Sequence, residues 1–384
     1  MIFYNKQQIE TILNGVADRI DISDTLFNEA TKEYQALGKW IDKTTKKDGT
    51  NFIVHIYPQG SFALGTLIKP ITDEDDYDLD LICEIINERS FTAEYLKKSI
   101  TKRWLTSYKR TSTEIEEKKR CWHVEYDEVP NFHMDVIPAI SGPSPEWINI
   151  TDKDEDNNTY RYMGSNPEGY IDWFLKQCKK TVTDSKGKAL INEMAIQDPV
   201  KKYRYKSNLQ KAIQLMKRHR DIMFKDNSDD KPISIIITTL AAQLYNGEQS
   251  VYDTLSVFMN NVEKYLNDKI KNGNYYISNP SLKGENFADK WIIYPQRRRA
   301  FFAWLECLQS DLDLRNLMAM DRVAMGKHMK KIFGDKTGNA IFTAQGIKEA
   351  LDVRNATKKV DLSTGALTKS GILMVPPSHH HGKI

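Results

Sequence analysis

Two aspartates, Asp78 and Asp80, stand two residues apart in a short apolar stretch at 77–82. Side chains alternate between the two faces of a strand, so both carboxylates point the same way while their apolar neighbours point into the core. Adjacent carboxylates repel each other, and oxygen ligands of this kind suit Mg²⁺. The apolar surroundings disfavour the alternative, a pair of solvated surface acids. The pair therefore indicates a metal site.

A turn rich in glycine precedes this pair at Gln59-Gly60-Ser61, and Gly65 follows it closely. Glycine lets the backbone approach a ligand, and backbone N–H groups together with the Ser61 hydroxyl can hold a phosphate. We therefore expect Gln59, Gly60 and Ser61 to bind a nucleotide. A phosphate turn and a metal-binding pair on adjacent segments together suggest nucleotidyl transfer.

A third carboxylate, Asp135, belongs to the second strand of a hairpin that the sequence predicts at 121–126 and 132–137. Alone it is unremarkable, but a third acid on a neighbouring strand is what a two-metal site requires. We therefore expect Asp78, Asp80 and Asp135 to be both catalytic and metal-binding.

The motifs Gly60-Ser61 and Asp78-Leu-Asp80, with a later acid, resemble the DNA-polymerase-β-like nucleotidyltransferase superfamily. The fuller stretches at 58–66 and 77–82 are similar to the bacterial cGAS/DncV-like nucleotidyltransferases, the CD-NTases of the SMODS type. The resemblance covers roughly residues 50 to 295. It implies an α+β fold in which a polymerase-β-like core, a mixed sheet with helices, packs against a C-terminal helical bundle.

The resemblance also implies that Lys217 and Ser234 hold the triphosphate. Lys217 lies in Leu-Met-Lys on a predicted helix at 207–224, and Ser234 follows Lys-Pro-Ile. From the residues alone, most of the basic side chains of this helix read as a solvated face. Many relatives place a tyrosine directly after the serine, where it stacks on a base. Here the residue is Ile235, so the sequence does not identify the stacking residue.

The activity that the resemblance implies is a pyrophosphate-releasing cyclic oligonucleotide synthase. Its product would be a cyclic di- or trinucleotide second messenger, made from nucleoside triphosphates with ATP included, in bacterial anti-phage signalling (CBASS). Two Mg²⁺ ions are implied, with Mn²⁺ as a possible substitute. So are a separately encoded effector that acts on the product and a possible regulatory protein partner.

Two alternatives stay open. One is a template-free transferase that tails RNA or makes linear oligoadenylates, and the other is a degenerate, non-catalytic nucleotide-binding module. A net charge of +3, from 55 basic and 52 acidic residues, argues against a long nucleic-acid groove. The presence of all three acids argues against a degenerate module.

The whole chain of 384 residues is long enough for one large domain or two closely packed ones. Its four cysteines show no metal spacing and predict reduced, mostly buried thiols. We find no signal peptide and no membrane span, and therefore expect a cytoplasmic protein.

The elements that must position these residues divide into three predicted parts. Residues 1–145 form the catalytic core with an N-terminal spine helix at 24–42, residues 146–355 a helical domain that completes the nucleotide pocket, and 356–384 a mobile tail. The stretch 141–163 reads as a loop. Further helices are expected at 91–108, from 166, 207–224, 232–245, 251–270, 296–309, 326–333 and 336–352. A strand is the alternative at 232–245.

Overall fold

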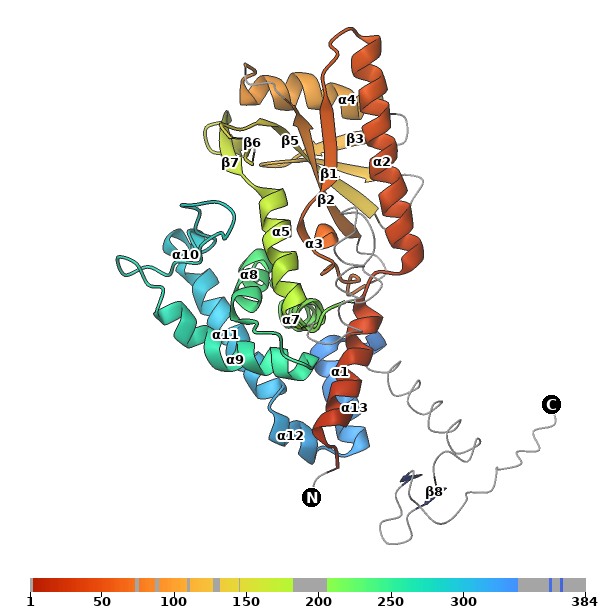
Figure 1. Cartoon of the computed structure of the whole chain (residues 1–384), viewed down its shortest axis with the longest axis vertical. Coiled ribbons are helices and arrows are strands. Elements are labelled where there is room, and N and C mark those ends of the chain that lie inside the picture. Colours follow the sequence, from red (N-terminus) through yellow and green to blue (C-terminus); the bar gives the residue numbers. More distant parts are fainter. Residues whose placement is uncertain are drawn as a thin grey trace, which may run out of the picture.

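A computed structural model of the chain describes residues 3–72, 76–86, 90–108, 111–126, 132–144, 146–181, 206–337, 359–360 and 367–368. A twisted sheet lies on one side and a group of helices on the other (Figure 1). The N-terminal helix α1 (Lys6–Ile20) runs along the group of helices, and α2 (Asp24–Lys47) runs along the sheet. The arrangement confirms the predicted α+β class and the packing of a mixed sheet against a helical bundle.

The sheet has seven strands, five of which follow the order β1-β2-β5-β4-β3. The β2 and β5 strands pair in parallel, and every other pairing in it is antiparallel. The strands are β1 Val54–Pro58, β2 Tyr77–Ile85, β3 Thr111–Glu117, β4 Trp122–Tyr126, β5 Phe132–Ser141, β6 Ile148–Asp154 and β7 Thr159–Ser165. The predicted hairpin is confirmed as β4 and β5.

The prediction of a loop at 141–163 is wrong, because β6 and β7 form an antiparallel hairpin there. The β6 strand pairs with the end of β5 and buries Ile148 and Ile150 in a small apolar cluster. The Asp- and Asn-rich stretch at 154–158 is the turn of this hairpin, where Asn158 adopts a φ of 52°. Because only a few residues of this hairpin are apolar, its alternation was too weak to read.

Helix α2 (Asp24–Lys47) lies along the sheet and begins at the N-cap Ser23, whose side chain accepts a hydrogen bond from the Leu26 N–H at 3.2 Å. It continues past residue 42, where the predicted helix ends: Thr45 in the last turns is buried, and Lys46 pairs with Asp42 across one turn at 2.7 Å. A π-helix at Tyr95–Thr101 and α4 (Lys102–Ser107) form the helical segment predicted at 91–108.

The helical side confirms the predicted helices between 166 and 333, and 232–245 is helix rather than strand. The elements are α5 Pro167–Cys178, a 3-10 turn Lys179–Thr181, α7 Asn208–Met223, α8 Ser234–Leu244, α9 Val251–Asn267, α10 Lys290–Ile293, α11 Pro295–Asp311, α12 Leu314–Ala319 and α13 Arg322–Phe333. Polar N-caps begin several of them, including Asn166 before α5 and Ser207 before α7.

Helix α1 (Lys6–Ile20) is a further element, which the sequence patterns did not suggest. Its apolar side chains, among them Ile9, Leu13 and Val16, are buried in the same core as α7 and α9. The N-terminal residues thus pack with the helical side, whereas α2 packs with the sheet. The division at 145 and 355 stays a prediction.

Three of the cysteines, Cys83, Cys121 and Cys178, are buried free thiols as expected, and Cys307 is exposed. Apart from residues 336–337 and a short pairing of β8 (Lys359–Val360) with β9 (Leu367–Thr368), the predicted helix 336–352 and tail 356–384 lie outside the described residues. In the part of the chain that is described, no helix is long and apolar enough to cross a membrane.

Candidate active site

The three predicted acids meet on two adjacent strands. In the parallel register of β2 and β5, Asp80 stands opposite Asp135 and Asp78 opposite His133. Burial, followed by the charges of Asp135 and Asp78, raises the pKa of Asp80 to about 7. Negative charge is therefore concentrated at this edge of the sheet, and a bound cation would offset it.

Two histidines that sequence analysis did not select contact these acids. The His123 Nδ1 lies 2.8 Å from Asp135 Oδ1, and His133 Nε2 contacts Asp78 Oδ1. The hydrogen bond between His133 and Asp78 lowers the pKa of Asp78. Burial alone would lower the pKa of His133, but this hydrogen bond and the charge of Asp78 outweigh burial, so the pKa of His133 is raised. His133 and Asp135 are two residues apart in the predicted strand at 132–137 and therefore share a face. This alternation is the sequence pattern that could have identified His133 as a site residue.

The donor set fits a divalent cation. Asp78, Asp80 and Asp135 offer carboxylate oxygens, the ligands that Mg²⁺ and Mn²⁺ prefer. Ligand atoms of His123, His133 and Asp135 also lie within 4.8 Å of one another. Because imidazole binds later transition metals well, these histidines make a softer metal a competitor at the same edge.

The phosphate turn lies directly against this cluster. It forms a short helix, α3 (Gly60–Ala63), and the N–H of Gln59 donates to the backbone carbonyl of Asp80 at 2.9 Å. Gly60 has a φ of 60°, and a Cβ atom on it would stand 2.4 Å from Asp80 Oδ2. The position therefore requires glycine, both for its backbone conformation and for the close approach of the carboxylate.

Helix α7 holds the segment that follows the turn. Four of its side chains, all buried, donate hydrogen bonds to backbone carbonyls of segment 64–70. The bonds run from Gln210 Nε2 to Leu64 O (2.9 Å), Gln214 Nε2 to Leu67 O (2.8 Å), Lys217 Nζ to Thr66 O (2.9 Å) and Arg218 Nη2 to Lys69 O (2.5 Å). The helix thus sets the position of this segment relative to the helical side.

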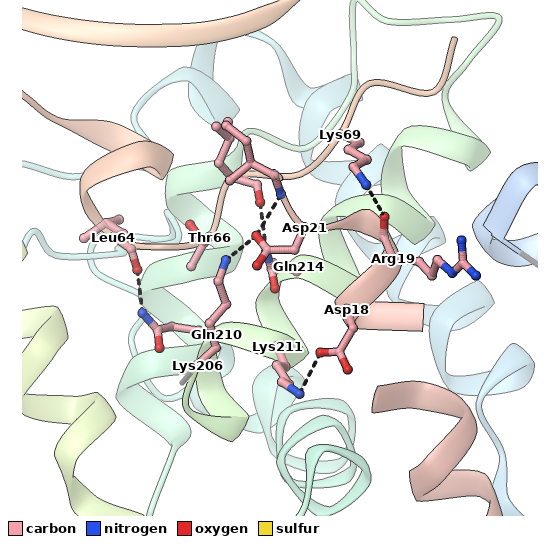
Figure 2. A network of polar contacts seen from close by, with 12 residues as sticks. Asp18, Arg19, Asp21, Leu64, Thr66, Lys69, Lys206, Gln210, Lys211 and Gln214 are labelled. Carbon is pink, nitrogen blue, oxygen red and sulfur yellow. Dashed lines mark hydrogen bonds and ion pairs between the residues drawn. The ribbon is translucent and has the colours of Figure 1, made fainter. Parts of the chain in front are cut away.

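The same network reaches the junction of α1 and α2 (Figure 2). Asp21 Oδ1 accepts hydrogen bonds from Lys206 Nζ at 2.5 Å and from Gln214 Nε2 at 3.0 Å. Lys69 Nζ donates to the carbonyl of Arg19 at 3.0 Å. The end of α1, helix α7 and the segment after the phosphate turn are therefore joined by one set of polar contacts.

The expectation that the basic side chains of α7 form a mostly solvated face is wrong. Lys217, Arg218 and Arg220 are 4–5% exposed. Burial, followed by the charge of Arg220, lowers the pKa of Lys217 to about 7. Arg220 Nη1 donates to Ser234 Oγ at 2.8 Å, at the first turn of α8. Arg220 thus links α7, the helix that carries Lys217, to the start of α8, which carries Ser234.

A cleft of about 1040 Å³ connects these parts. Its lining includes Ser61 from the phosphate turn, Asp80 from the acidic cluster, and Lys217 and Ser234 from the helices. Arg297 of α11 lines it too. A volume of this size matches the upper end of small-molecule pockets, about 300–1,000 Å³. The cleft can therefore hold nucleotide phosphates beside the acidic cluster.

Known proteins share this sequence pattern. Residues 8–177 match the family described as "Second Messenger Oligonucleotide or Dinucleotide Synthetase domain" (SMODS). A protein named c-di-GMP synthase from Roseivirga ehrenbergii is 29% identical over 86% of this chain and 85% of its own length. A protein named cyclic dinucleotide synthase CdnG from Bradyrhizobium diazoefficiens is 22% identical over 96% of this chain and 89% of its own length.

Solved structures show the same fold. The Bradyrhizobium diazoefficiens CD-NTase CdnG, in complex with GTP, aligns with a TM-score of 0.70 at 21% identity, over 88% of this chain and 99% of that chain. The Escherichia coli CdnC:HORMA-deltaN complex aligns with a TM-score of 0.59 at 16% identity, over 84% of this chain and 96% of that chain.

Proposed function

We propose that this chain is a member of the SMODS-domain, cGAS/DncV-like nucleotidyltransferases, as the match of residues 8–177 and the similar proteins support, and that it makes a cyclic dinucleotide second messenger with GTP as a substrate. The observation that carries the proposal is the convergence of Asp80, Asp135 and the Gly60 turn at one edge of the sheet. A phosphate turn placed against paired carboxylates suits attack of a hydroxyl on an α-phosphate, with pyrophosphate leaving.

The side chains of this site have separable roles in the proposed reaction. Ser61 and the backbone of the turn hold phosphate oxygens, while Lys217 and Ser234 steady the rest of the triphosphate. Asp78, Asp80 and Asp135 would hold two Mg²⁺ ions, or Mn²⁺, which lower the pKa of the attacking hydroxyl and neutralise charge on the leaving group. Positioning and charge stabilisation supply most of the catalysis.

The names of two similar proteins support guanine as the base of the substrate. One is named a c-di-GMP synthase, and the structure of another is a complex with GTP. The sequence-based expectation that the product contains adenine stays a prediction, as does the alternative of a trinucleotide. Two rounds of the same transfer close the ring if the linear intermediate, which carries a 5′-triphosphate and a free hydroxyl, rebinds reversed. One site therefore suffices.

The proposal includes a role in anti-phage signalling in the bacterial cytoplasm, through a separately encoded effector that acts on the cyclic product. A regulatory protein partner is part of it as well, and the CdnC:HORMA-deltaN complex of a structural relative supports that possibility. The near-neutral charge of the chain gives no reason to add nucleic acid as a partner.

The test is to incubate the purified full chain with Mg²⁺ and labelled ATP, GTP, CTP and UTP, singly and together, followed by phosphatase treatment and mass analysis. We expect a guanine-containing cyclic dinucleotide that resists phosphatase because it has no terminal phosphate. A ladder of longer products, or complete conversion by phosphatase to smaller species, would replace this proposal with the linear-oligomer alternative. Nucleotide binding without any product would support a non-catalytic module.

A further inference from the structure

A second, smaller cavity of about 220 Å³ opens on the other side of the phosphate turn. Three residues, Gly60, Leu64 and Ile235, line both this cavity and the large cleft. Most of the remaining wall comes from the start of α5, including Tyr170, and from the loop between α9 and α10, including Phe287. The two spaces therefore adjoin at the residues that flank the phosphate site.

We infer that this cavity binds the guanine base of the nucleotide whose phosphates lie on the turn, with Glu285 reading the base edge. The inference rests on the proposed function, which supplies a nucleoside triphosphate in the large cleft. Ile235 follows Ser234 directly, so a nucleotide with phosphates near Ser61 and Ser234 can pass its base along Ile235 into the smaller space. A space of 220 Å³ suits one part of a nucleotide, since pockets for whole small-molecule ligands measure about 300–1,000 Å³.

The apolar wall of the cavity is preorganised. The rings of Tyr170 and Phe287 meet edge to face, with centroids 6.1 Å apart. Tyr170 is buried, and its hydroxyl shares a hydrogen bond of 2.8 Å with Thr239 Oγ1. Aromatic and aliphatic surfaces of this kind contact a base through its flat face. Tyr170 and Phe287 thus supply the contact with the base for which the sequence, with Ile235 in place of tyrosine, did not identify a residue.

The polar wall is held just as firmly. Asn279 Nδ2 donates to Glu285 Oε2 at 2.6 Å, and the Asn279 N–H donates to the Glu285 carbonyl at 3.0 Å. The loop is tied to α5 by two bonds of 3.0 Å, from Asn166 Nδ2 to Ser281 O and from Ser281 Oγ to Asn166 O. Within the described part of the chain, Oε1 of Glu285 accepts no hydrogen bond. One carboxylate oxygen thus remains for a ligand.

The chemistry of a carboxylate selects guanine. An ionised carboxylate only accepts hydrogen bonds, and each of its oxygens has two lone pairs. Guanine presents two adjacent donors, N1–H and the N2 amino group, which Oε1 of Glu285 can accept together. Adenine offers a donor beside an acceptor at the corresponding edge, so its N1 lone pair would face a negative charge. Sites built to hydrogen-bond a particular group reject analogues that lack it. Glu285 is therefore a specificity-determining residue for the proposed reaction.

The experiment measures binding of three unreactive α,β-methylene triphosphates, those of guanosine, inosine and adenosine, to the full chain with Mg²⁺ by calorimetry. Inosine lacks only the N2 amino group. Since a hydrogen bond to a charged group is worth about 1.5–3 kcal/mol, we expect the wild-type chain to bind the guanosine compound at least about tenfold tighter than the inosine compound. Adenosine should bind more weakly still.

Glu285→Gln should reduce the ratio of guanosine to inosine affinity to about two or less, because a neutral amide oxygen accepts a hydrogen bond about half as strongly as a carboxylate. Glu263→Gln, on the exposed face of α9, is the matched control and should keep the wild-type ratio. Phe287→Leu should weaken all three compounds by a similar factor. Thermal unfolding of each variant checks that it is folded.

Equal binding of the guanosine and inosine compounds to the wild-type chain would overturn the inference without any variant. So would a wild-type ratio in a folded Glu285→Gln chain. Because binding needs no turnover, the outcome is separate from that of the proposed function. A cyclic product with an unchanged ratio removes Glu285 alone, whereas a guanine-selective chain without cyclic product removes the synthase proposal.

Discussion

The carboxylate of Asp80 occupies the space where a side chain on Gly60 would stand. A Cβ at Gly60 would lie 2.4 Å from Asp80 Oδ2, and the φ of Gly60 is 60°, a value that side chains disfavour. The N–H of Gln59 also donates to the carbonyl of Asp80 at 2.9 Å. The phosphate turn and the acidic cluster are thus built in contact, and the position of one sets the position of the other.

Gly60→Ala should therefore lose activity although it adds only a methyl group. Displacement of reacting groups by about 1 Å can cost on the order of 10²-fold in rate, and we expect a loss of that size in kcat/KM. Gly164→Ala is the control, because a Cβ there meets nothing within 4 Å and the φ is not positive. Steady-state pyrophosphate release measures both variants, and near wild-type activity of Gly60→Ala would contradict the close contact.

Asp80→Asn should separate activity from stability. The carboxylate of Asp80 is half-buried and feels the charges of Asp135 and Asp78, so its removal relieves repulsion in the metal-free protein, and the melting temperature should stay the same or rise. Product formation should fall by about 10²–10³-fold or more, as when a group that stabilises developing charge is removed. Asp172→Asn, exposed on α5, should change neither quantity. An unfolded or fully active Asp80→Asn protein would make the cluster structural.

Lys217→Met and Gln214→Leu each remove one hydrogen bond from α7 to segment 64–70. Gln214→Leu also removes the bond to Asp21, and only Lys217→Met removes a basic group. Both should lower the free energy of unfolding by about 1–3 kcal/mol, because a buried carbonyl loses its donor. Only Lys217→Met should raise the KM for GTP by about tenfold or more with a smaller change in kcat, as expected for a phosphate contact made before and during reaction. Equal KM values for the two variants would remove Lys217 from the phosphate site.

Removal of divalent metal with a chelator should abolish product formation, and Mg²⁺ or Mn²⁺ should restore it. A readout independent of activity is the melting temperature, because a ligand that binds only the folded chain stabilises it. We expect Mg²⁺ to raise the melting temperature of the wild-type chain and not that of Asp80→Asn. The same shift in both proteins would place the ion elsewhere.

Much of the site could be predicted from local patterns, because the residues of the phosphate turn, and likewise Asp78 and Asp80, lie close together in the sequence. Alternation in 77–82 puts Asp78 and Asp80 on one face, and the glycines of 60–65 mark the phosphate turn. Both depend on residues within a few positions of one another. Helices with polar caps and an apolar stripe, such as α5 and α7, were recognisable for the same reason.

Contacts between distant segments were decided only by the tertiary structure. The parallel pairing that sets Asp80 opposite Asp135 joins strands with other elements between them, and no local pattern specifies that register. The polar face of α7 looks solvated in sequence because its partners are backbone carbonyls of segment 64–70, which side-chain identities do not reveal. Glu285 and Phe287 reach the neighbourhood of Gly60 for the same reason: folding, not spacing along the chain, determines which surfaces enclose a common cavity.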